Sequence, residues 1–270
     1  MEFQLAAVHK EISKVLKDRF KAELAFIQLK PGNPGALTEA HKLLSKFQDK
    51  ELKAAFLPLI EEELDKRNSQ CKKTLSVFLQ AAKDAGFGLR EMAGGWRVGP
   101  LYLELDTTDA KVRFSYNRTP IGGVVQADSE AVVMDGFQAA LTQLQQEALP
   151  EEQLGELFTK AYQMALAYTG KAPGERVYVR TVAKLFGFLA ADLTHNGAKG
   201  KGSAEYPLWA FQYNLDTYRK IASSLPNHQR LGLLTGSQTE TSKEGLTING
   251  LDPNVDYNMI CHVAAALAAN

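Results

Sequence analysis

Basic and amide side chains gather in residues 176–220, in a pattern suited to binding phosphate and reading bases. Arg176, Arg180 and Lys184 are each four residues apart, so on a helix they would form one basic ridge. Arginine and lysine bind the phosphates of nucleic acids, whereas glutamine and asparagine form hydrogen bonds with base edges. The candidate nucleic-acid-binding residues are Arg176, Arg180, Lys184, Lys199, Lys201, Gln212, Asn214, Arg219 and Lys220.

The Gly-rich segment 196–203 contains Lys199 and Lys201 and is predicted to be a loop. It shares glycine and lysine with nucleotide-binding phosphate loops. Those loops need four residues between their glycines and follow a strand, whereas this segment follows a predicted helix and lacks that spacing. We therefore interpret it as a basic loop that can lie on a phosphate backbone.

Glu104, Asp106 and Asp109 could together bind Mg²⁺ on a sheet face, as the acids of nucleases do. A common type of nuclease also carries a Glu-x-Lys pair on the following strand, where Lys111 and Arg113 lack that spacing. Cross-strand ion pairs between these acids and cations are the favoured interpretation. A magnesium-dependent nuclease is kept as an alternative.

No other constellation of side chains predicts chemistry. Residues 252–258 place oxygen ligands at alternate positions, but Tyr257 stands where a calcium loop needs glycine. The five histidines show no metal-ligand spacing with one another or with Cys71 and Cys261. The sequence therefore predicts no catalytic residue, no bound metal and no cofactor.

The composition is that of a globular protein with no overall charge. The chain holds 31 Lys or Arg and 31 Asp or Glu, and 45% of its residues are apolar, which excludes a generally polybasic binder. Residues 176–250 are locally basic, with nine Lys or Arg and five Asp or Glu. Two distant cysteines, no signal peptide and no long apolar run predict a cytoplasmic protein that does not enter the membrane.

Periodicity divides the chain into three predicted regions. Residues 1–85 repeat apolar side chains at helical spacing, with breaks at 31–34 and near Pro58, and form a helical bundle or a docking region for a protein partner. Residues 86–174 begin with short alternating strands, an antiparallel β-meander, which helices at 134–147 and 151–168 would cover.

Residues 175–270 predict a winged-helix-like region. Two helices joined by the basic loop would precede a hairpin of strands 231–235 and 245–249, and a helix at 255–269 would end the chain. The loop between the helices is longer than a true helix-turn-helix allows. The predicted hairpin tip also has only Lys243 as a cation, against Glu240 and Glu244.

The sequence thus predicts an α+β protein that binds nucleic acid, with DNA as the expected ligand, without catalysing a reaction. It would act as a regulator or as the adaptor subunit of a larger assembly. Two alternatives stay open. One is a magnesium-dependent nuclease that uses the acids of the β-meander, and the other is a subunit that only contacts other proteins, through residues 1–85.

Overall fold

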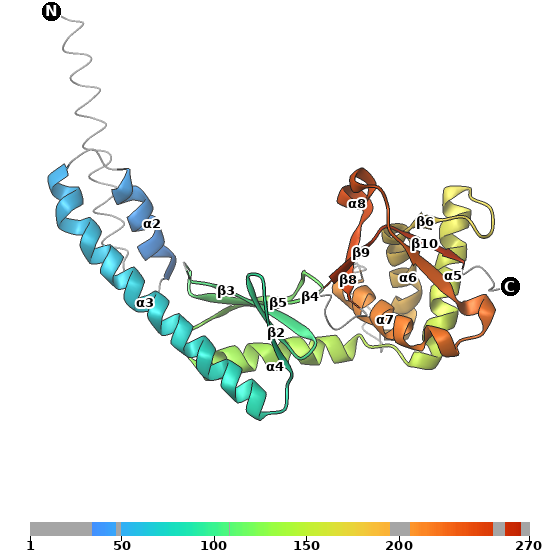
Figure 1. The fold of residues 1–270 in the computed structure, drawn as a ribbon, viewed down its shortest axis with the longest axis horizontal. Coiled ribbons are helices and arrows are strands. Elements are labelled where there is room, and N and C mark those ends of the chain that lie inside the picture. The colour runs from blue at the N-terminus through green and yellow to red at the C-terminus, as the bar shows by residue number, and fades with distance from the viewer. Residues whose placement is uncertain (1–33, 47–49, 108, 195–205, 251–256, 266–270) are drawn as a thin grey trace, which may run out of the picture. The chain divides into compact units, whose positions relative to one another are not determined.

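The computed structural model describes residues 34–46, 50–107, 109–194, 206–250 and 257–265, and Figure 1 shows its elements along the chain. The structure combines helices with antiparallel sheets, so the predicted α+β class is confirmed. The chain divides into two compact units. The first comprises Met1–Phe87, Glu104–Val112 and Val124–Asp135, and the second comprises Gly88–Leu103, Arg113–Gly123 and Gly136–Asn270.

Two helices, α2 (Pro34–Ser45) and α3 (Lys50–Asp84), pack together in the first unit. The sequence predicts a kink or a restart of the helix at Pro58, and because Pro58 lies inside α3 without ending it, the helix does not restart there. Proline removes one backbone hydrogen bond, and a helix of 35 residues keeps many others. None of the described helices combines the length and the apolar run that crossing a bilayer needs. The helix predicted over 2–28 lies outside the described residues.

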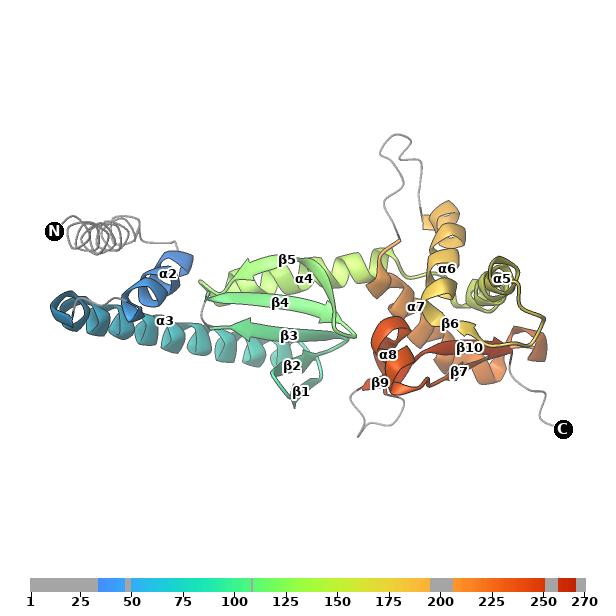
Figure 2. The same cartoon turned by 90° about the horizontal axis from the view of Figure 1, so that it is seen from above.

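The β-meander is a five-stranded sheet in which each strand lies beside the next along the chain (Figure 2). Leu101 and Leu103 are buried on β3, and Val112 and Phe114 are buried on β4, while the side chains between them are more exposed. This alternation gives the sheet one apolar face, as predicted. The strands are β1 (Leu89–Met92), β2 (Gly95–Val98), β3 (Leu101–Asp106), β4 (Lys111–Tyr116) and β5 (Thr119–Gln126).

A helix covers part of this apolar face. Phe137 of α4 (Glu130–Gln146) is fully buried, and its ring centroid lies 5.8 Å from that of Phe114 on β4. The covering helix predicted near 134–147 is therefore present. At the end of β4, Asn117 and Arg118 both adopt positive φ angles, 47° and 66°, the conformation of a tight two-residue hairpin turn.

Three helices of the second unit share an aromatic core around Phe158. The ring centroid of Phe158 lies 4.4 Å from that of Phe186, 4.7 Å from Tyr218 and 5.7 Å from Phe211. Large buried rings contribute much of a core's apolar area, so this cluster holds the helices together. They are α5 (Glu151–Thr169), α6 (Val179–Thr194) and α7 (Leu208–Ile221).

The strands that follow α7 do not form the predicted hairpin. β7 (Leu231–Leu234) pairs with β10 (His262–Ala265), and β8 (Leu246–Asn249) pairs with β9 (Tyr257–Ile260). The short helix α8 (Gln238–Glu244) separates β7 from β8. The winged hairpin is thus absent from the described residues, and residues 257–265 form strands in place of the predicted C-terminal helix.

β10 is the central strand of a three-stranded sheet in the order β6-β10-β7, where β6 is Val177–Tyr178. His262 and Val263 of β10 pair with both neighbours. Each outer strand therefore depends on the C-terminal strand for its pairing. Two 3₁₀ helices, Ala222–Ser224 and Asn227–Gln229, connect α7 to β7.

Candidate nucleic-acid interface

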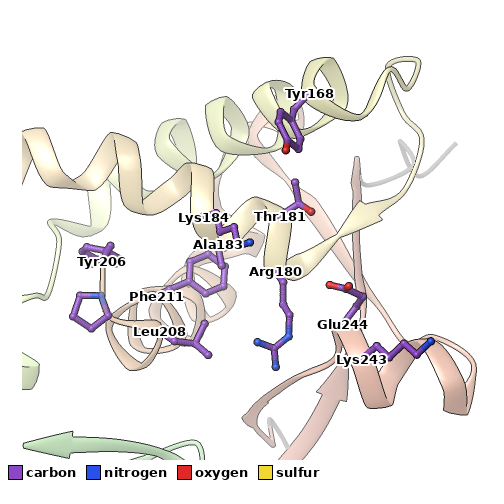
Figure 3. Close-up of a pocket in the computed structure, with 11 residues that line it drawn as sticks. Tyr168, Arg180, Thr181, Ala183, Lys184, Tyr206, Leu208, Phe211, Lys243 and Glu244 are labelled. Carbon is purple, nitrogen blue, oxygen red and sulfur yellow. The ribbon is translucent and has the colours of Figure 1, made fainter. Parts of the chain in front are cut away.

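A pocket of about 960 Å³ lies in the second unit, between the end of α5, the first turns of α6 and α7, and α8. Figure 3 shows Arg180 extending from α6 into the space between Leu208 of α7 and Glu244 of α8, with Tyr168 above it on α5. We name this site the cationic pocket. It is lined by Tyr168, Arg180, Thr181, Ala183, Lys184, Tyr206, Pro207, Leu208, Phe211, Lys243 and Glu244.

Of the residues that the structure describes, three cations line this pocket, Arg180, Lys184 and Lys243, against one acid, Glu244. Arg180 and Lys184 are four residues apart on α6, so they project from the same face of the helix. The Nε atom of Arg180 is shielded from solvent and has no hydrogen-bond acceptor among the described residues. A guanidinium donor held without an acceptor favours an anionic ligand, since phosphate oxygens accept its hydrogen bonds well.

Lys243 and Glu244 end the short helix α8, which begins with a helix cap. The Ser237 side chain accepts a hydrogen bond from the Glu240 backbone N–H, and the Glu240 carboxylate accepts from the Ser237 backbone N–H at 2.9 Å. The Ser237 backbone N–H and, next, its hydroxyl both donate to the Glu240 carboxylate, and these bonds hold the pKa of Glu240 below its ordinary value. Reciprocal bonds of this kind satisfy backbone donors at a helix start, so the cap stabilises the helix that carries Lys243 and Glu244.

Tyr206 forms one wall of the pocket and is held on two sides. Its hydroxyl accepts a hydrogen bond from Asn214 Nδ2 at 3.0 Å, and its ring lies 5.9 Å from that of Phe186. A Cβ atom at Gly187 of α6 would come within 2.5 Å of the Tyr206 Cβ atom. Glycine at position 187 therefore lets Tyr206 pack directly on the backbone of α6.

A buried carboxylate anchors α7. Asp216 is 4% exposed, and its Oδ2 accepts hydrogen bonds from Tyr116 Oη at 2.9 Å, Asn117 Nδ2 at 2.8 Å and Asn249 Nδ2 at 2.8 Å. Its other oxygen accepts from Arg219 at 2.8 Å. Burial, followed by the negative charge of Asp216, raises the pKa of Tyr116 well above its ordinary value. This cluster ties the turn after β4 and the end of β8 to the helix.

Three of the predicted binding residues serve this internal structure instead. Gln212 and Asn214 are each 1% exposed. Gln212 donates to the backbone oxygen of Thr247 at 2.7 Å, and Asn214 donates to that of Glu147 at 2.9 Å. Arg219 donates to Asp216 and to the backbone oxygen of Asn249. The prediction that Gln212 and Asn214 reach base edges is wrong, because neither side chain is accessible to a ligand.

The remaining predicted residues are divided between several places. Arg180 and Lys184 lie in the cationic pocket. Arg176 precedes β6, so it is not on the helix that carries the other two, and the predicted three-residue ridge does not form. Lys220 is exposed in the last turn of α7, about 18 Å along that helix from Leu208. Lys199 and Lys201 lie outside the described residues.

Two of the three acids proposed for Mg²⁺, Asp106 and Asp109, form local contacts, and Glu104 is exposed. Asp109 pairs with Lys111 at 3.1 Å, and the Asp106 carboxylate accepts from the Asp109 backbone N–H. Among the described residues, no three His, Cys, Asp or Glu side chains come together as a metal site. Both cysteines are free and buried, and burial raises the pKa of each thiol.

Comparison with protein-family models, with curated proteins and with solved structures finds no match to this chain. Its function must therefore be inferred from the site itself.

Proposed function

We propose that this chain is a non-catalytic nucleic-acid-binding protein whose cationic pocket takes the phosphate backbone. The observation that carries the proposal is the position of Arg180, Lys184 and Lys243 around one pocket, with the Arg180 Nε atom lacking an acceptor among the described residues. Arginine and lysine together supply the sequence-independent part of nucleic-acid affinity.

The dimensions of the pocket favour a polymer over a small anion. A volume of about 960 Å³ far exceeds what one phosphate needs, and Lys184 is exposed. The cations come from two elements, α6 and α8. A ligand with charges repeated along its length can satisfy both elements at once, which a single inorganic phosphate cannot do.

The test is binding of labelled oligonucleotides, followed by fluorescence anisotropy at several salt concentrations. Arg180→Ala plus Lys184→Ala should weaken binding to every sequence. The slope of log affinity against log salt is negative, and removal of each cation that binds a phosphate should make it shallower by about 0.7 to 0.9. Lys220→Ala is the matched control, since it also removes a helical cation but one outside the pocket.

The double variant must keep the parent's circular dichroism spectrum for the comparison to hold. Equal affinity and an equal salt slope for the parent and a folded double variant would refute the proposal. An equal weakening in Lys220→Ala would also refute it, because the effect would then follow total charge and not the pocket. Regulator or adaptor roles, and a protein partner for residues 1–85, stay predictions from the sequence.

A further inference from the structure

Two aromatic side chains beside the cationic pocket are unusually exposed. Tyr168 is 79% exposed and Phe188 is 69% exposed, whereas Phe158, Phe186 and Phe211 in the same unit are almost fully buried. Large apolar rings are normally withdrawn from water. Their exposure next to a group of cations therefore calls for a ligand with flat, apolar faces.

Each of these rings lies near Lys184, one across the pocket and the other along α6. Tyr168 lies in the last turn of α5, which ends at Gly170 in the left-handed conformation, with φ 66°. It lines the pocket together with Lys184, as Figure 3 shows. Phe188 follows Lys184 by four residues on α6, so it shares the face of the helix that carries Lys184. Lys184 thus has one exposed ring as a pocket neighbour and a second one turn further along its own helix.

We propose that the ligand of the cationic pocket is a single-stranded nucleic acid, whose bases stack on Tyr168 and Phe188 while Arg180, Lys184 and Lys243 bind its phosphates. This inference rests on the proposed function. Grooves for single strands combine cations that follow the backbone with aromatic rings that stack on bases. Stacking tolerates any sequence, since every base has a flat π-face.

A duplex fits this surface poorly. Its bases are already stacked and paired, so only their edges are available, and edges are read by amide and guanidinium groups. The amides that the sequence offered for that purpose, Gln212 and Asn214, are buried and hydrogen-bonded within the protein. The two exposed rings have nothing to stack on along the grooves of an intact duplex.

The test compares oligodeoxythymidine, oligouridine and a DNA duplex of equal length on the full chain. The parent should bind the single strands at least about tenfold more tightly than the duplex. Tyr168→Ala and Phe188→Ala should each weaken single-strand binding by about tenfold, with the salt slope unchanged because every phosphate-binding cation is still present. Leu234→Ala, which removes another exposed apolar side chain outside the pocket, should have no effect.

The results distinguish a failure of the stacking inference from a failure of the proposed nucleic-acid binding. If the chain binds no nucleic acid, or binds only an acidic polypeptide such as polyglutamate, both proposals fail. If it binds duplex as tightly as single strands, and Tyr168→Ala and Phe188→Ala bind like the parent, the stacking inference is overturned while the cationic pocket stands. Preference for oligodeoxythymidine or for oligouridine would identify DNA or RNA as the natural single strand, and either result supports the inference.

Discussion

Asp216 shows how one buried residue supports the candidate interface without touching a ligand. Its carboxylate accepts hydrogen bonds from Tyr116, Asn117 and Asn249 and forms an ion pair with Arg219. The Arg219 side chain is 10% exposed, so its charge depends on this partner. A buried charge left without its partner costs far more than an exposed ion pair contributes.

Replacement of Asp216 by alanine should therefore lower the free energy of unfolding by about 3 to 5 kcal/mol. The destabilisation comes from leaving Arg219 unpaired and removing the acceptor for three side-chain donors. Urea unfolding measures it. The control is Glu91→Ala, which removes an exposed acid from β1 and should change stability little. A change below about 1 kcal/mol for Asp216→Ala would mean that solvent reaches Arg219 and screens it.

Sequence patterns on α7 indicate its apolar side correctly but misplace its polar residues. Phe211, Leu215 and Tyr218 are buried as their spacing predicts. Gln212 and Asn214 are predicted to be exposed, yet both are buried because α7 is contacted by other chain segments on more than one side. Local periodicity identifies one buried face, whereas a polar partner such as the Thr247 backbone, distant in sequence, cannot be identified from it.

The short helix α8 begins with the Ser237 and Glu240 cap and ends with two residues of the cationic pocket, Lys243 and Glu244. It has seven residues, too few to be stable as an isolated helix. Its stability therefore depends on the Ser237 and Glu240 cap and on nearby charges. His262 of β10 faces Glu240, with Nε2 3.7 Å from Oε1, and Arg176 also acts on that carboxylate.

This cap should make α8 sensitive to acid. The pKa of Glu240 is lowered in the folded chain, so its stabilising effect is fully present above the ordinary glutamate value of 4.5 and is lost as pH falls through the lowered folded value. Hydrogen exchange at the Glu240 backbone N–H, corrected for intrinsic rates, should show protection fall in that range. Glutamine also supports a capping box, so Glu240→Gln should stay protected there. An equal fall in protection in parent and variant would exclude Glu240 as the titrating group.

The sequence contains the signature of the α8 helix cap, but it does not indicate which strands pair with β7 and β8 on either side of that helix. Ser237 with Glu240 three residues later is the ordinary signature of a helix start, although the strand-like runs on either side predict a hairpin tip for this stretch. Strands β7 and β8 lie close to their predicted positions. Their partners, β10 and β9, lie after residue 256, where an alanine-rich sequence favours helix. Tertiary pairing overrides that local preference.

At the scale of the whole molecule, a chain with no net charge places Arg180, Lys184 and Lys243 around one pocket. The 31 Lys or Arg and 31 Asp or Glu cancel overall, so long-range attraction to a polyanion is weak and affinity must come from local contacts. Lys243 and Tyr168 complete the pocket but are not assigned to it from the sequence. They reach it from α8 and α5, and only the folded arrangement of four helices brings them beside Arg180.

If the cationic pocket binds phosphates as proposed, the number of its cations should set the salt dependence of binding. Arg180, Lys184 and Lys243, at about 0.7 for each phosphate bound on a single strand, predict a slope of log affinity against log salt near −2. Lys199 and Lys201 lie outside the described residues, and their participation would add up to about −1.4. Titration of the parent and of Lys199→Ala plus Lys201→Ala against oligodeoxythymidine distinguishes these cases. A parent slope near −2 that the variant shares assigns phosphate binding to the pocket alone. A slope near −3.4 that returns to about −2 in the variant adds Lys199 and Lys201 to the interface, and a slope near zero contradicts phosphate binding by the pocket and by these two lysines.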